Sequence, residues 1–162
     1  MLDSQPTKIA YSYWILGLIQ AFHSMEETYT KLYSYFGSIS EALHQYLPWI
    51  PVFEISADLF AILNYLIIAL MLGSMPSAEK ETQWGWYFMC TWAIIELLNG
   101  TFHICTWLFL HQYFPGGVTG SVLFVVSIIF IQKLRTVSSK KVVVDCKTDH
   151  KMVNAGIEKK SA

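Results

Sequence analysis

The sequence predicts an all-α protein, with a four-span transmembrane helical bundle over residues 1–134 and a flexible basic tail over residues 135–162. Apolar residues make up 54% of the 162-residue chain, and its mean hydropathy is +0.39. Four segments approach the roughly 20 apolar residues that a helix needs to cross a bilayer: about 9–29, 50–73, 84–110 and 117–132. A soluble bundle would need a polar stripe on every helix, and residues 59–72 and 118–131 offer none.

The first segment is expected to be a retained helix rather than a cleaved signal peptide. Lys8 is a thin basic region, and no small-x-small cleavage site precedes the acidic pair Glu26-Glu27. The second segment is expected to run inward from Pro51. A tight turn is predicted between the third and fourth segments, at residues 113–117, because proline fixes φ and glycine permits positive φ.

Orientation in the membrane follows from the basic residues, most of which lie after the fourth segment. By the positive-inside rule the tail is cytosolic. Four spans then place the N-terminus with Lys8, and the loop with Lys80, on the same side, whereas residues 30–49 and 112–117 face outward. Eight of the 11 basic residues are in this last region: Lys133, Arg135, Lys140, Lys141, Lys147, Lys151, Lys159 and Lys160.

The last four residues, Lys159-Lys160-Ser161-Ala162, resemble the di-lysine signal that returns membrane proteins to the endoplasmic reticulum. We therefore expect the endoplasmic reticulum membrane if the organism is eukaryotic, and a bacterial inner membrane otherwise. A net charge of -1 gives no reason to expect nucleic acid as a partner. Nucleotide-binding motifs are absent, and the three cysteines imply no disulfide framework.

Ionisable side chains inside the predicted spans mark a candidate functional site, because a charge at a helix centre costs about 2.5–3.5 kcal/mol on insertion scales. His23, Glu26 and Glu27 share one helix face, since residues three and four apart are neighbours. Glu54 and Asp58 form a similar pair on the second predicted span. The first two spans thus each carry a polar face.

The third predicted span has a polar stripe as well, because Glu96, Asn99 and His103 are spaced i, i+3 and i+7. With a rise of about 1.5 Å per residue, all three polar faces reach the outer half of the membrane. We therefore expect the first and third predicted spans to bring His23 close to His103 in one pocket. The pocket is expected to hold His23, His103 and Asp58 together with Glu26 or Glu27.

Three short patterns in this region resemble the motifs of a known family. His23-Ser-Met-Glu26-Glu27, Asn99-Gly-Thr-Phe-His103 and Tyr113-Phe-Pro115-Gly116 are similar to the HxxEE, NxxxH and YxPG motifs that mark the HXXEE family of small integral membrane proteins. They occur in the family's order and cover about residues 10–130. The resemblance implies that the matched residues act as a unit. It implies no reaction, because the family has no established activity.

The first functional hypothesis is a metal-dependent enzyme that acts on a lipid or another hydrophobic substrate. Two imidazoles and a carboxylate suit a catalytic zinc or a non-haem iron. The remaining carboxylates would act as general base, and Asn99 would orient a ligand or polarise a carbonyl. A di-iron version would also use Glu96 with Asp58. Candidate metal ligands are His23, Glu26, Glu27, Asp58 and His103, and candidate catalytic residues are Glu26, Glu27 and Asn99.

Two alternatives remain open. The same histidine and carboxylates could perform metal-free acid/base chemistry, such as isomerisation of a sterol or isoprenoid, because desolvated groups of this kind can exchange protons near neutral pH. The polar groups could instead tie helices together in a non-enzymatic lipid-binding, transport or scaffold protein. Membrane lipid and a hydrophobic small molecule are the expected partners in the first two cases. A second copy of the chain is a further candidate partner, although no small-xxx-small motif stands out.

Overall fold

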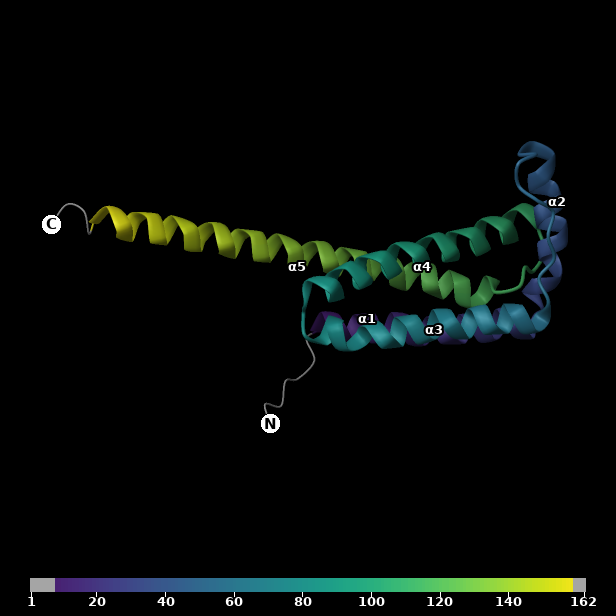
Figure 1. Ribbon diagram of the computed structural model, residues 1–162, viewed down its shortest axis with the longest axis horizontal. Helices are drawn as coiled ribbons and strands as arrows, with labels where there is room; N and C mark the ends of the chain where they lie inside the picture. Colours follow the sequence, from purple (N-terminus) through teal and green to yellow (C-terminus); the bar gives the residue numbers. More distant parts are fainter. Residues whose placement is uncertain (1–7, 159–162) are drawn as a thin grey trace.

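Four long helices run side by side as an elongated bundle, and a short helix lies across one end (Figure 1). The computed structural model describes the backbone of residues 8–158 and the side chains of residues 9–138, with no strand among them. We call the two ends of the bundle the α2 end and the tail end; α1 begins, and α5 extends outward, at the tail end (Figure 1). The elements are α1 (Lys8–Tyr29), the 3-10 helix η1 (Leu32–Tyr35), α2 (Phe36–Tyr46), α3 (Ala57–Glu79), α4 (Gln83–Leu110) and α5 (Gly117–Glu158).

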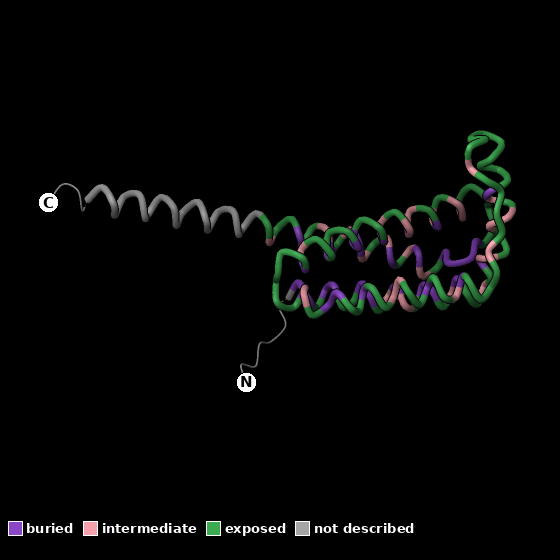
Figure 2. Tube along the Cα trace, in the orientation of Figure 1, coloured by how far each residue is buried: buried purple, intermediate pink, exposed green. Residues whose placement is uncertain are grey.

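The bundle buries polar side chains together with an apolar core, and its outer surface is mainly apolar, unlike that of a soluble protein. Figure 2 shows the buried positions on the inner faces of the helices and the exposed ones outside. Leu66, Ile94 and Val125 are each more than half exposed, whereas Glu96 and His103 are 1% exposed. Exposed apolar side chains in such number need a lipid solvent, because soluble monomers rarely expose large contiguous apolar patches. The chain is therefore an integral membrane protein.

Among the described residues, three helices, not the four expected, are both long and apolar enough to cross a membrane. They are α3 with 23 residues, α4 with 28 and the Gly117–Ser138 part of α5 with 22. The first predicted span, α1, has 22 residues but is too polar, because Gln20, His23 and Ser24 interrupt it and Glu26 follows. The side chains of Gln20, His23 and Ser24 point into the bundle, where they are buried.

The second predicted span begins later than expected, and this changes where its acidic residues lie. Residues 51–56 form no helix, and α3 begins after Ser56, whose hydroxyl accepts a hydrogen bond from the Leu59 N–H at 3.2 Å. The apolar residues before this cap belong to the link from α2. Glu54 thus lies outside any helix and Asp58 in the first turn of α3, so the predicted pair within a span is wrong.

Helix α5 continues beyond residue 134, where the sequence predicted the start of a flexible tail. It ends at Glu158, and residues 135–155 contain neither proline nor glycine to stop it. Residues 30–49, predicted as a loop, contain η1 and α2. The proposed di-lysine signal, residues 159–162, lies outside the described residues.

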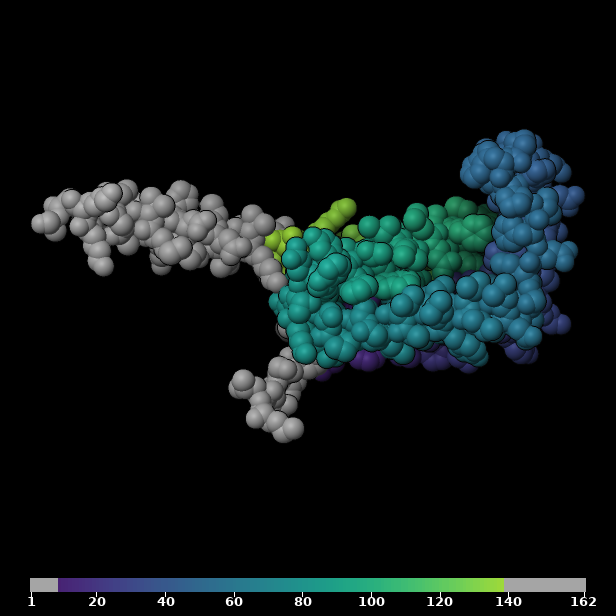
Figure 3. Space-filling model, viewed as in Figure 1, coloured from purple at the N-terminus to yellow at the C-terminus, as the bar shows by residue number. Residues whose placement is uncertain are grey.

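Two apolar clusters hold the bundle together, one toward each end. The larger cluster, toward the tail end, packs Leu16, Met71, Met89 and Phe130 from four helices. The smaller one, toward the α2 end, contains Leu32, Phe60 and Phe114. In the space-filling view α3 and α4 cover the face turned to the viewer, and α2 covers the end (Figure 3). The polar side chains of α1 and α4 lie between the two clusters along these helices.

Helices α4 and α5 approach each other closely at Gly100. A Cβ added to Gly100 would lie 2.7 Å from the Gly120 oxygen and 2.7 Å from the Phe124 nitrogen, both backbone atoms that cannot move without shifting α5. Gly73 on α3 provides a contrast, because a Cβ there would meet nothing within 4 Å. Close packing at Gly100 therefore sets the distance between α4, which carries His103, and α5, which begins directly after the turn.

Gly100→Ala should destabilise the protein by about 1–3 kcal/mol, the usual range for overpacking, because the two backbones must separate. Gly73→Ala is the matched control and should leave stability unchanged or slightly raise it, since alanine favours a helix. Thermal unfolding of both variants in the same detergent measures the difference. Equal melting temperatures for the two variants would show that α4 and α5 are not packed as closely as described.

Candidate functional site

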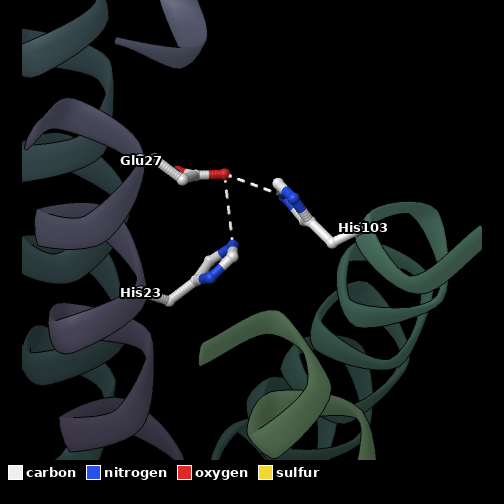
Figure 4. Close-up of side chains that lie close together, drawn as sticks. All are labelled: His23, Glu27 and His103. Atoms are coloured by element: carbon white, nitrogen blue, oxygen red, sulfur yellow. Dashed lines mark hydrogen bonds and ion pairs between the residues drawn. The ribbon is translucent and has the colours of Figure 1, made fainter. Parts of the chain in front are cut away.

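Three buried side chains from α1 and α4 converge on a single point (Figure 4). The Glu27 Oε1 atom lies 3.1 Å from the Nε2 atom of His23 and 3.0 Å from the Nε2 atom of His103. The two rings meet edge to face, with centroids 4.7 Å apart and planes at 85°. His23 and Glu27 are one helical turn apart on α1, and His103 comes from α4. The predicted approach of the two histidines is confirmed.

Glu26, next to Glu27 in sequence, points elsewhere and caps the N-terminus of α5. Its Oε1 accepts hydrogen bonds from the Tyr113 hydroxyl at 2.6 Å and the Val118 N–H at 3.2 Å. Its Oε2 accepts one from the Thr119 N–H at 2.7 Å and another from the Thr119 hydroxyl. A carboxylate is favourable here because the free N–H groups carry the positive end of the helix dipole. Glu26 therefore positions α5 and does not join the convergent cluster.

Thr119 contacts both Glu26 and His23, the histidine that faces Glu27. Its Oγ1 atom donates to Glu26 and lies 2.9 Å from the Nδ1 atom of His23. A side chain that holds the second nitrogen of an imidazole fixes the orientation of the ring. Thr119 thus orients His23 so that its Nε2 faces Glu27.

The turn before α5 passes directly over His103. Gly116 has φ of +79°, and a Cβ there would lie 2.6 Å from the Cε1 and 2.9 Å from the Nδ1 of His103. Phe114 is buried beside the same imidazole, with ring centroids 5.6 Å apart. Burial and the adjacent Glu26 carboxylate raise the pKa of Tyr113 in this turn, which keeps its phenol a hydrogen-bond donor. The predicted tight turn forms, and only glycine fits at position 116.

Other predicted site residues lie outside the convergent cluster. Asp58 is exposed in the first turn of α3. Asn99 is half-buried and Glu96 fully buried, and both line a cavity of about 440 Å³ that also touches Glu27 and His103. Among the described side chains, the only group of three or more that could share an ion is His23, Glu27 and His103. The predicted participation of Glu26 and Asp58 as ligands, and a second metal on Glu96 and Asp58, do not match this arrangement.

Three neighbours of the site were not expected from the sequence: Gln20, Asn64 and Thr119. The Gln20 side chain donates to the Ser24 hydroxyl at 3.2 Å, which in turn donates to the Asn64 carbonyl oxygen at 3.3 Å. Gln20 precedes Glu27 by two helical turns, and Asn64 is a single amide in an apolar run. Both residues could therefore have been identified from the sequence. Thr119 gave no signal, because its role depends on how α5 packs against α1.

The fold and the site together define a small helical membrane protein built around a buried histidine–glutamate cluster. Residues 14–131 match a family model described as a protein of unknown function with HXXEE motif. The chain therefore belongs to the HXXEE family. Comparisons with curated proteins and with solved structures gave no match.

Glu26→Gln should destabilise the protein even without any metal. Hydrogen bonds to a charged group are each worth about 1.5–3 kcal/mol, and the amide would turn a donor toward the N–H groups of α5. Glu41→Gln is the control, because Glu41 is exposed on α2. Thermal unfolding in detergent with a chelator should show a fall of several degrees for Glu26→Gln alone. A melting temperature equal to that of Glu41→Gln would argue against the capping role.

Proposed function

We propose that this protein is a membrane-embedded, metal-dependent enzyme that acts on a lipid, with His23, Glu27 and His103 as the ligands of a zinc or iron ion. The observation that carries the proposal is the orientation of the His23 ring. The nitrogen that faces Glu27 has no hydrogen atom to offer when the ring is neutral, as the hydrogen bonds of Thr119 show.

Thr119 has one hydroxyl hydrogen, and it is directed at Glu26. Glu26 accepts from two backbone N–H groups and a phenol as well, so it is an acceptor and does not supply a proton to Thr119. The His23 Nδ1 must then donate to the Thr119 oxygen, at 2.9 Å. A neutral His23 is left with a lone pair on Nε2, only 3.1 Å from a glutamate oxygen. Two facing lone pairs call for a cation between them.

The distances from the Glu27 oxygen to the two histidine nitrogens are close to those around a metal ion, and all three ligand atoms lie within 4.8 Å of one another. A tetrahedral zinc with bonds of about 2.0–2.2 Å separates neighbouring ligand atoms by about 3.3–3.6 Å. The contacts of Glu27 with His23 and His103 are 3.1 and 3.0 Å, so small side-chain movements would make room. Two imidazoles and one carboxylate also match the facial set of non-haem iron. Three protein ligands leave a position for water or substrate.

A lipid substrate follows from the surroundings of the site. We place α1 in the membrane with the three apolar helices, since its outward side chains include Ile15, Leu18, Phe22 and Met25, all more than half exposed. The ligands then lie within the bilayer, where substrates are hydrophobic. By the positive-inside rule the tail end faces the cytosol.

The expected division of labour is simple. A bound ion would polarise a substrate oxygen or lower the pKa of a bound water. Glu27 and the histidines would hold the ion, with Thr119 fixing the ring of His23. Asn99, which lines the cavity beside Glu27 and His103, would orient the polar group of the substrate.

A second candidate is metal-free acid/base catalysis, and the same geometry favours it. If His23 carries two protons, its Nε2 donates to Glu27, and the glutamate then joins two imidazoles in one proton path. Isomerisation of an isoprenoid or sterol would be the reaction class. The two candidates differ in what lies between His23 and Glu27: a metal ion or a proton.

Metal content separates the two candidates. The protein, purified in detergent with its affinity tag removed, should contain about one zinc or iron per chain by elemental analysis. His23→Ala and His103→Ala should lose it, and Thr119→Val should bind it about 10–100-fold more weakly. His44→Ala is the control, because His44 lies on α2 outside the cluster. Equal metal content in all four variants would exclude this site, and no metal in the wild type would favour acid/base chemistry.

A further inference from the structure

The cavity next to the cluster has an apolar wall and a polar floor. Its volume is about 440 Å³, within the roughly 300–1,000 Å³ usual for small-molecule sites. Leu63 and Ile67 of α3 and Ile95 of α4 form part of the wall. Toward the tail end it is lined by Gln20, Asn64 and Glu96, on three different helices.

The polar floor carries hydrogen-bonding atoms that have no partner among the described residues. The amide chain from Gln20 through Ser24 to Asn64 uses one end of each amide and leaves Gln20 Oε1 and Asn64 Nδ2 unpaired. Neither carboxyl oxygen of Glu96 makes a hydrogen bond of normal geometry, although Asn99 is its polar neighbour. All three side chains of the floor are buried.

Unpaired groups of this kind are costly. A buried polar group without a partner costs about 1–3 kcal/mol, and most such groups in folded proteins are paired. Their convergence on one cavity, from α1, α3 and α4, suggests that a ligand pairs with them. The ligand must both donate to the Gln20 carbonyl oxygen and accept from the Asn64 amide.

We propose that this cavity binds a long-chain lipid with an uncharged hydroxyl head, held by Gln20, Asn64 and Glu96, with its chain leaving between α3 and α4. The inference rests on the proposed function, because it names the substrate class of the same site. A hydroxyl both donates and accepts, as the floor requires. Leu63 and Ile95 are each more than two-fifths exposed, so the wall continues to the lipid-facing surface.

Other head groups satisfy the floor less well. An ammonium only donates and would leave the Asn64 Nδ2 unpaired, and an ester only accepts and would leave the Gln20 Oε1 unpaired. A carboxylate would lie beside Glu96 and Glu27, and no lysine or arginine among the described side chains lines the cavity. The donor and acceptor pattern therefore selects an alcohol among lipids of equal chain length.

A series of C18 lipids tests this directly. Saturable binding of tritiated oleyl alcohol is measured on the full chain in nanodiscs, with oleate, oleylamine and methyl oleate as competitors. We expect the alcohol to bind at least about tenfold more tightly than each of the other three. Equal binding of all four, or tightest binding of oleylamine, would overturn the proposal.

Variants assign the binding to the floor. Asn64→Leu and Gln20→Leu should each weaken alcohol binding at least about tenfold. Ser127→Ala is the control, because the Ser127 hydroxyl is also buried and unpaired but does not line the cavity. Melting curves verify that each variant is folded. If Asn64→Leu unfolds, Asn64→Ser takes its place, because serine keeps a hydrogen-bond donor in a smaller side chain. Unchanged alcohol binding by the folded variants would overturn the assignment.

The assay is run on both chelated and zinc-loaded protein, so that the two proposals can fail separately. Selective alcohol binding by a protein that takes up no metal would support the cavity and end the metal proposal. Stoichiometric metal with no preference for the alcohol would support the metal centre and end the inference about the head group.

Discussion

The structure depends on one buried carboxylate. Glu27 lies inside a bundle whose outer surface is apolar, and an uncompensated charge there would be very costly. Two imidazoles, one on α1 and one on α4, approach a single oxygen of this carboxylate. Helix α1 otherwise packs mainly on α3 and α5, so the contact with His103 is a main link between α1 and α4. The apolar clusters at the two ends of the bundle keep this link away from water.

The adjacent glutamates of the HXXEE motif divide two tasks between them. Because successive residues on a helix point about 100° apart, Glu27 turns toward His103 while Glu26 turns toward the start of α5. The cap formed by Glu26 fixes Thr119, and Thr119 fixes the ring of His23. Through Thr119 of α5, Glu26 thus helps to position the His23 ring that contacts Glu27. A proline–glycine turn completes the enclosure, since Gly116 lets the chain cross His103 at a distance no larger residue allows.

Much of this arrangement could be predicted from the sequence, and the failures have physical causes. Helical spacing was enough to place His23 and Glu27 on one face and to expect His103 opposite them. It could not separate Glu26 from Glu27, because both lie within one turn of His23 and the partners of Glu26 come from α5 and the turn before it. Asp58 was misplaced because apolar residues before Ser56 resemble a span, whereas the helix starts at the serine cap. Polar residues on its inner face made α1 less apolar than the sequence interpretation assumed.

X-ray absorption spectroscopy of the purified, tag-free protein at the zinc or iron edge tests the central claim most directly. A site made by His23, Glu27 and His103 predicts a shell of nitrogen and oxygen atoms at about 2.0–2.2 Å with the multiple-scattering signature of two imidazoles. Glu27→Gln should change that shell, whereas Glu41→Gln should not. A shell of sulfur atoms at about 2.3 Å, or one without imidazole, would place the metal elsewhere and contradict the account.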